Sequence, residues 1–138
     1  MKRFTENQQG VIADSKNGLI WAKEDSWQKD GKWVTFDEAM DFARHLVDLE
    51  LSGSIKWRLP TIEEAKTLYV PDLTILDKYG QEIHLDPAFP EGCLANMWIH
   101  EIATGNEGYF INLATGEVGR KFKSIAGRMS ARPVYEMQ

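Results

Sequence analysis

The sequence is poor in cysteine and has no long apolar run. Cys93 is the only cysteine among 138 residues, which excludes an internal disulfide and any metal site that needs a pair of thiolates. No stretch approaches the roughly 20 apolar residues of a membrane-spanning helix. Residues 1–6 lack the apolar stretch of a signal peptide, so we expect a cytoplasmic protein if Met1 is the native start and an exported one if the chain has been trimmed.

An overall excess of positive charge is also missing. The net charge of −5 argues against general nucleic-acid binding, because proteins hold these polyanions mainly by neutralising phosphates. The last part of the chain differs, since residues 118–135 contain no acid and five cations, namely Arg120, Lys121, Lys123, Arg128 and Arg132. These cations either form a local basic face or offset the acids of neighbouring segments in the fold.

The apolar content is high enough for one core. With 43% hydrophobic residues in 138, we expect a single domain over residues 1–138. Two short apolar runs around Asn17 and Gly18 predict a β-hairpin over residues 11–21, because both residues tolerate the positive φ of a tight turn. Residues 22–32 are too polar for a core element and are interpreted as a surface loop that carries Trp27.

Two capping boxes predict the starts of two helices. Thr35 with Glu38, and Thr61 with Glu64, have the spacing of this motif. In it, the threonine side-chain oxygen accepts from the glutamate N–H, and the glutamate carboxylate accepts from the threonine N–H. The apolar periodicity predicts that the first helix runs to about residue 49 or 50. The second is shorter and ends before the proline at position 71.

The periodicity fails over residues 72–108, which we interpret as a packed but irregular region with short ordered pieces at residues 73–76 and 96–99. A second hairpin is predicted over residues 109–122, with Gly116 at its turn. A last strand is predicted over residues 129–135. Because Pro133 lacks an N–H group, that strand should lie at a sheet edge or a bulge.

Three separated motifs resemble one family. Residues 17–21 read Asn-Gly-Leu-Ile-Trp, and residues 128–134 form a closing strand that contains Arg-Pro-Val. Between them lies a strand-to-helix motif, made of Trp57, Arg58, Leu59, Pro60 and Thr61. The chain resembles the Lcl C-terminal domain family, also called domain of unknown function 1566. That resemblance implies an α+β, C-type-lectin-like fold related to the formylglycine-generating enzyme fold, in which two helices flank a mixed, mainly antiparallel sheet, the terminal strands pair and a long irregular loop region presents the ligand surface.

The same resemblance bears on function. Members are often exported bacterial proteins, and adhesion and glycan binding have been proposed for some. The calcium-dependent lectins use Glu-Pro-Asn, Gln-Pro-Asp and Trp-Asn-Asp triplets, and none occurs here, so we expect recognition without calcium. Formylglycine-generating enzymes rely on two cysteines, which this chain does not have.

We interpret the chain as a non-catalytic recognition module that binds a glycan or a protein through the long-loop face, without a cofactor. Aromatic and hydrogen-bonding side chains gather in this region, as small-molecule sites require. The candidate binding residues are Trp27, Asn96, Trp98, His100, Glu101, Asn106, Glu107 and Tyr109. Trp98 has a second interpretation as a core residue, because it lies between two apolar neighbours in a predicted strand.

Two alternatives remain open. One is a metal-dependent enzyme that uses His84, Cys93 and His100, which are ligand types for zinc or iron although their spacing matches no known ligand pattern. The other is a structural or assembly domain in which the basic last segment meets an acidic partner surface. Arg58 has the structural interpretation of a partly buried guanidinium satisfied by carbonyl groups or an acid.

Overall fold

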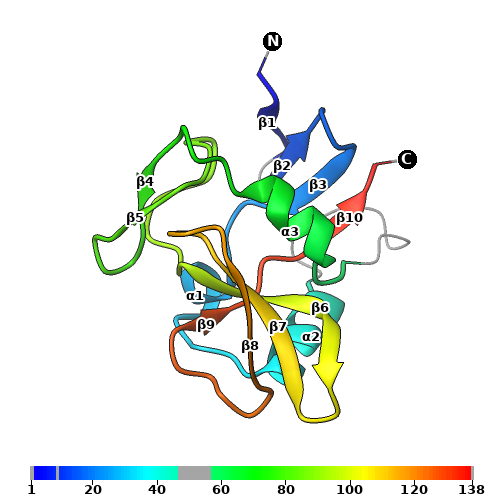
Figure 1. Ribbon diagram of the computed structural model, residues 1–138. Helices are drawn as coiled ribbons and strands as arrows, with labels where there is room; N and C mark the ends of the chain where they lie inside the picture. The colour runs from blue at the N-terminus through cyan, green and yellow to red at the C-terminus, as the bar shows by residue number, and fades with distance from the viewer. Residues whose placement is uncertain (1, 9, 47–56, 138) are drawn as a thin grey trace.

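The computed structural model describes residues 2–8, 10–46 and 57–137, and it has an α+β fold (Figure 1). Short helices accompany strands that are mostly antiparallel, as the sequence predicts. In the view of Figure 1 the sheet with both chain ends lies at the top, a second large sheet lies at the bottom, and a two-stranded ribbon lies to the left.

The first sheet joins the beginning and the end of the chain. Its strands, in the order in which they lie side by side, are β1 (Phe4–Gln8), β2 (Val11–Asp14), β3 (Leu19–Ala22) and β10 (Val134–Glu136). The predicted hairpin is confirmed, since β2 and β3 pair antiparallel around a turn in which Gly18 has a φ of 67°. This hairpin pairs with the C-terminal strand through β3. The outermost strands β1 and β10, however, lie at opposite edges of this sheet and do not pair with each other. The first and last strands, which the resemblance implies to be paired, are therefore connected only by the hairpin strands β2 and β3 between them.

The second large sheet is built from the last third of the chain. Its order is β8 (Val118–Phe122), β7 (Glu107–Asn112), β6 (Asn96–Thr104) and β9 (Met129–Ser130), with only β6 and β9 parallel. The predicted hairpin with Gly116 at its turn is confirmed as β7 and β8, and the φ of Gly116 is 80°. A separate ribbon pairs β4 (Ile75–Leu76) with β5 (Glu82–Ile83). Strand β6 therefore extends well beyond the short ordered piece predicted at residues 96–99.

The predicted final strand is divided in two. β9 and β10 belong to different sheets, and Pro133 lies between them. Because Pro133 cannot donate a ladder hydrogen bond, the chain leaves one sheet and enters the other at this point. The carbonyl group of Pro133 still accepts a hydrogen bond from the Ala22 N–H at 2.9 Å.

Both predicted helix starts are confirmed. α2 (Phe36–Arg44) and α3 (Ile62–Leu68) each begin with a complete capping box, at Thr35 and Thr61 respectively. α2 ends at Arg44, earlier than the predicted residue 49 or 50, and residues 47–50 lie outside the described residues. None of the helices in the described ranges is long and apolar enough to cross a membrane.

The prediction of a loop over residues 22–32 was wrong, because part of it is the helix α1 (Ser26–Asp30). The Asp25 carboxylate accepts a hydrogen bond from the Gln28 N–H at 2.9 Å, and the Gln28 amide oxygen accepts one from the Asp25 N–H at 3.0 Å. Gly31 ends the helix with a φ of 68°. The capping residues and the terminal glycine were present in the sequence, but the helix is too short to show an apolar periodicity.

Two aromatic side chains connect α2 to the second large sheet. Trp98 is 0% exposed, its ring lies edge-on to Phe36 with 5.6 Å between ring centres, and its indole N–H donates to the Val34 carbonyl at 2.9 Å. Phe36 approaches the sheet closely at Gly108, where an added Cβ would lie only 3.0 Å from the phenyl ring. A side chain at position 108 would therefore require the rings of Phe36 and Trp98 to shift by a few tenths of an ångström.

The strand-to-helix motif of residues 57–61 is connected to α3 by an ion pair. Arg58 donates to both carboxylate oxygens of Glu64 at 2.7 and 2.9 Å, and a third bond reaches the Leu59 carbonyl at 3.3 Å. Burial by itself raises the pKa of Glu64, but the hydrogen bonds from Arg58 and from the Thr61 backbone outweigh it and hold that pKa below its ordinary value. Arg58 thus contacts an acid and a carbonyl group.

Candidate functional site

A surface row of alternating rings and cations lies where three elements meet. Lys78 Nζ lies 4.9 Å from the ring centre of Trp27 and 5.6 Å from that of Tyr79, while the guanidinium carbon of Arg128 lies 4.7 Å from the ring centre of Tyr79. These are cation–π distances. Trp27 lies on α1, Lys78 and Tyr79 lie in the turn between β4 and β5, and Arg128 directly precedes β9. The labels α1, β4, β5 and β9 are on the left of Figure 1. We call these four residues the aromatic–cation row.

The Trp27 end of the row is fixed by α1. Besides capping the helix, Gln28 reaches across to the segment before β6, because its amide nitrogen lies 3.1 Å from both the Pro90 and the Glu91 carbonyl oxygens. A five-residue helix alone would be marginal in water. These tertiary hydrogen bonds therefore hold Trp27 at its place in the row.

The centre of the row is fixed by a tight turn. One carboxylate oxygen of the buried Asp77 accepts hydrogen bonds from the N–H groups of Tyr79 and Gln81, both at 2.8 Å. This is the way in which aspartate stabilises a turn through its own following backbone. The Lys78 N–H donates to the Cys93 carbonyl at 2.7 Å, so the turn is also attached to the chain beneath it.

The Arg128 end of the row carries backbone strain. Arg128 has a φ of 60°, and within the described residues no other non-glycine residue has a positive φ. The left-handed conformation costs an L-residue about 1–2 kcal/mol. The next residue, Met129, is held on both sides, since its N–H donates to the Ala126 carbonyl at 2.9 Å and its carbonyl accepts from the Val34 N–H at 3.0 Å. Strain that the surrounding structure maintains in this way is concentrated at functional sites.

The cations of the row are available to an external anion. Within the part of the chain that the structure describes, neither Lys78 nor Arg128 belongs to an ion pair. Tyr79 is 46% exposed, so the row is accessible from solvent. Because the rings restrict the movement of both cations, an anion that binds them has less side-chain entropy to remove.

Arg132, Asp25 and Cys93 are buried polar residues, and the first two hold backbone segments together. Arg132 is 1% exposed and donates to the carbonyls of Ala22 and Lys23 at 2.9 and 2.5 Å. Asp25 accepts from the Leu94 N–H at 2.8 Å, and burial raises its pKa in spite of the nearby Arg132. Burial also raises the pKa of the Cys93 thiol to about 11, so the thiol is protonated at neutral pH and is not a nucleophile.

Two of the residues predicted to bind a ligand instead support the fold. The Trp98 side chain is fully buried and its only polar atom donates to Val34, so it presents no surface to a ligand. Trp98 therefore lies in the apolar core, as its second interpretation has it. Glu101 accepts a hydrogen bond from the Ile62 N–H at 3.0 Å and thereby caps the first turn of α3.

The other predicted residues are spread along β6 and β7, whereas Trp27 lies on α1. His100 is exposed on β6, and Tyr109 on β7 packs partly against the largest apolar cluster. Asn96 is half-buried where β6 meets β9. Asn106 and Glu107 lie at the turn that joins β6 to β7. The structure therefore brings Trp27 together with Lys78, Tyr79 and Arg128, which are not among the candidate binding residues.

Lys78, Tyr79 and Arg128 were missed for different reasons. The order Asp77-Lys78-Tyr79-Gly80 is typical of an exposed turn, and an aromatic side chain beside a lysine in such a turn could have indicated a binding residue. Arg128 follows a glycine, but nothing in the sequence indicates that it meets Tyr79. That contact depends on the long-range packing of the segment after β8.

The metal-ligand candidates do not assemble. His84 Nδ1 lies 3.0 Å from the Leu73 carbonyl and 3.3 Å from the Thr74 hydroxyl, Cys93 is buried, and His100 is exposed. No group of three or more histidine, cysteine, aspartate or glutamate residues that could hold a metal ion occurs among the residues with a described position. The alternative of a metal-dependent enzyme therefore finds no site in the described part.

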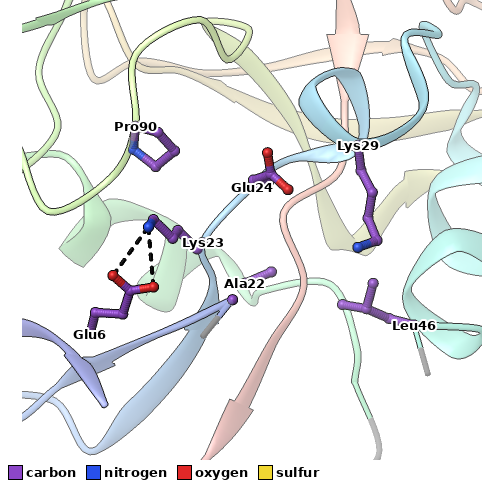
Figure 2. Close-up of a pocket in the computed structure, with 8 residues that line it drawn as sticks. Glu6, Ala22, Lys23, Glu24, Lys29, Leu46 and Pro90 are labelled. Atoms are coloured by element: carbon purple, nitrogen blue, oxygen red, sulfur yellow. Dashed lines mark hydrogen bonds and ion pairs between the residues drawn. The ribbon is translucent and has the colours of Figure 1, made fainter. Parts of the chain in front are cut away.

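Figure 2 shows a cavity of about 300 Å³ beside β1, the end of β3 and α1. Its lining includes two acids and two lysines, but Lys23 Nζ already lies 3.1 Å from both carboxylate oxygens of Glu6. The charges in this cavity are thus at least partly neutralised by each other. It is a weaker candidate for ligand binding than the aromatic–cation row.

Comparison with known proteins identifies the family of the chain. No curated protein matches the chain. The model of the Lcl C-terminal domain matches residues 10–135, which include the first hairpin, α1, α2, α3 and the first two residues of β10. Since that match covers most of the sequence, the chain belongs to the Lcl C-terminal domain family.

Proposed function

We propose that this chain is a non-catalytic recognition module that binds a glycan carrying acid groups through the aromatic–cation row. The observation that supports this proposal is the pair of cations, Lys78 and Arg128, which lie against ring faces and have no ion-pair partner in the described ranges. Carboxylate or sulfate groups of a sugar would accept hydrogen bonds from these cations. The apolar faces of the sugar rings would pack against Trp27 and Tyr79.

The proposal includes a C-type-lectin-like arrangement. It is supported by the pairing of β3 with β10, which brings the beginning and the end of the chain together in one sheet. It is also supported by the position of Lys78 and Tyr79 in the irregular region between α3 and β6. In this arrangement the irregular region presents the ligand surface. Because Lys78 and Arg128 would neutralise the acid groups directly, recognition needs no bridging calcium ion.

The dimensions of the row favour a glycan over a protein ligand. A stable protein interface buries about 800 Å² on each partner and involves roughly 20–30 residues a side. The row consists of four side chains, far fewer than such an interface involves. A narrow, extended ligand with regularly spaced acid groups fits such a surface better.

The experiment is a binding measurement by biolayer interferometry on immobilised polygalacturonate, dextran sulfate and uncharged dextran, with poly-glutamate as an acidic polypeptide. We expect binding to at least one acid-bearing polysaccharide, weaker binding at higher salt, and none to dextran. The double variant Lys78→Gln with Arg128→Gln should abolish binding. The matched control Lys16→Gln with Arg120→Gln removes the same charge from exposed positions outside the row and should bind like the parent chain.

Several outcomes would contradict the proposal. Equal losses in the row variant and the control would show that only net charge matters, and stronger binding to poly-glutamate than to either polysaccharide would assign the row to an acidic protein. The role of the rings is tested by Tyr79→Ala, which should weaken polysaccharide binding while the circular dichroism spectrum stays unchanged. A fall in the chain length of the polysaccharide during incubation would show catalysis and reject a purely recognising role.

A further inference from the structure

A second cavity lies at the other end of the segment that carries Arg128. It has a volume of about 460 Å³ and is lined by Thr35, Asp37, Asn106, Phe122, Lys123 and Ser124. These residues come from the start of α2, the turn between β6 and β7, and the end of β8, at the bottom of Figure 1. We call it the Phe122 cavity, and it shares no lining residue with the aromatic–cation row.

The walls of the Phe122 cavity are connected to each other by hydrogen bonds. The Lys123 N–H donates to the Asn106 carbonyl at 2.9 Å, and the Lys123 carbonyl accepts from the Phe36 N–H at 3.1 Å. The Lys123 ammonium donates to the Gly105 carbonyl at 3.0 Å and lies 5.4 Å from the ring centre of Phe36. All three elements are therefore held in place before any ligand arrives, and the ammonium group already has partners.

The groups that remain free for a ligand are an aromatic ring and a few polar atoms. Phe122 is 53% exposed, more than any other large hydrophobic side chain among the described residues. The side chains of Asp37 and Ser124 have no hydrogen-bond or ion-pair partner in the described part of the protein, and Asn106 uses its amide oxygen for the Thr104 hydroxyl at 3.2 Å. Its amide nitrogen is left as a donor.

We propose that the Phe122 cavity binds a neutral pyranose. The apolar face of the sugar ring would pack on Phe122, the Asp37 carboxylate would accept from two neighbouring hydroxyl groups, and the Asn106 amide nitrogen would donate to a third oxygen. The volume lies within the range of about 300–1,000 Å³ that is usual for small-molecule sites.

The charges in the cavity distinguish this ligand from the one proposed for the row. Asp37 would repel an acid group, and the Lys123 ammonium, which is held by Gly105 and Phe36, would repel a cationic amino group. An uncharged polyhydroxylated ring avoids both penalties. The inference goes beyond the proposed function, because it adds a site for another class of ligand and does not need the row to bind anything.

The test is saturation-transfer-difference NMR followed by calorimetric titration with methyl α-glucoside, methyl α-mannoside, methyl β-galactoside and methyl α-fucoside. At least one of these glycosides should bind with a millimolar dissociation constant. Phe122→Ala and Asp37→Asn should each weaken that binding roughly tenfold or more. The matched controls are Ile125→Ala, another exposed apolar residue in the same segment, and Asp41→Asn, one turn further along α2. Both controls should bind like the parent chain.

Failure of this inference can be distinguished from failure of the proposed function. The row variant Lys78→Gln with Arg128→Gln should keep the affinity for the neutral glycoside, and Phe122→Ala should keep the affinity for the acid-bearing polysaccharide. If no glycoside of the panel binds at millimolar concentration, or if Phe122→Ala and Ile125→Ala bind equally well with unchanged melting curves, the Phe122 cavity is not a sugar site. Loss of glycoside binding in the row variant would place the sugar at the row instead.

Discussion

Arg128→Gly should weaken ligand binding at the row while leaving stability nearly unchanged. At a φ of 60°, replacing arginine by glycine removes a backbone cost of about 1–2 kcal/mol. Glycine loses about 0.5–1 kcal/mol more entropy on folding, and the exposed cation–π contact with Tyr79, at 4.7 Å, is worth about 0.5–1 kcal/mol. These contributions nearly cancel. The free energy of unfolding, measured by urea denaturation, should therefore change by less than about 1 kcal/mol.

The affinity of Arg128→Gly should fall much more. A hydrogen bond to a charged group contributes about 1.5–3 kcal/mol, which corresponds to a roughly 10- to 150-fold higher dissociation constant for the acid-bearing polysaccharide. Arg128→Ala is the matched variant, because alanine also removes the cation but keeps the left-handed strain. Both variants should bind equally weakly, with the alanine variant about 0.5–1 kcal/mol less stable than the glycine variant. Equal stability would refute the reasoning on strain, and parent-like affinity would refute the role of Arg128 in binding.

Further predictions concern the supporting structure. Cys93 has a thiol pKa of about 11 and is buried, so iodoacetamide should alkylate it only in denaturant; rapid labelling of the native protein, seen by mass spectrometry, would contradict this. Glu64→Gln keeps the capping box but removes the charge opposite Arg58, and should lower the unfolding free energy at pH 7 by about 1–3 kcal/mol. Because the pKa of Glu64 is lowered in the fold, its charge stabilises above the ordinary value of 4.5 and this contribution is lost as the pH falls through the folded value, so the two proteins should converge in acid. Trp98→Phe leaves the Val34 carbonyl without its donor and should cost about 1–3 kcal/mol without changing polysaccharide affinity; a weaker affinity at unchanged stability would return Trp98 to the binding site.

The features that could be predicted from the sequence are those whose physics is local. A capping box requires only a threonine and a glutamate three residues apart, and the starts of α2 and α3 at Thr35 and Thr61 follow directly. A hairpin turn requires only residues that tolerate a positive φ, which Gly18 and Gly116 supply. These signals do not depend on where the rest of the chain lies.

The row could not be predicted, because its members meet only through tertiary contacts. Trp27 and Tyr79 are far apart in the sequence, and their common neighbour Lys78 is placed by the carboxylate of Asp77 and by a hydrogen bond to the Cys93 carbonyl. Trp98 shows the opposite difficulty. An aromatic residue between two apolar neighbours has the same sequence pattern whether it faces a ligand or the core, and only the packing of α2 on β6 decides between them.

Several acids of this chain, whose net charge is −5, are used to accept hydrogen bonds from the backbone. Asp25, Asp77 and Glu101 each accept hydrogen bonds from backbone N–H groups, at a helix start or in a turn. Among the described residues, none of these three carboxylates forms an ion pair with Lys78 or Arg128.

The cations of residues 118–135 have correspondingly few acid partners. Arg132 is buried against carbonyl groups and the Phe89 ring, while Lys121 and Lys123 lie 5.0 and 5.4 Å from the ring centres of Phe110 and Phe36. Arg128 rests on a tyrosine in the same way. The ring faces hold these cations without cancelling their charge, because a ring quadrupole carries no net charge. Salt screens charges over about 8–10 Å, so an anion that approaches the row meets mainly the charges that lie close to it.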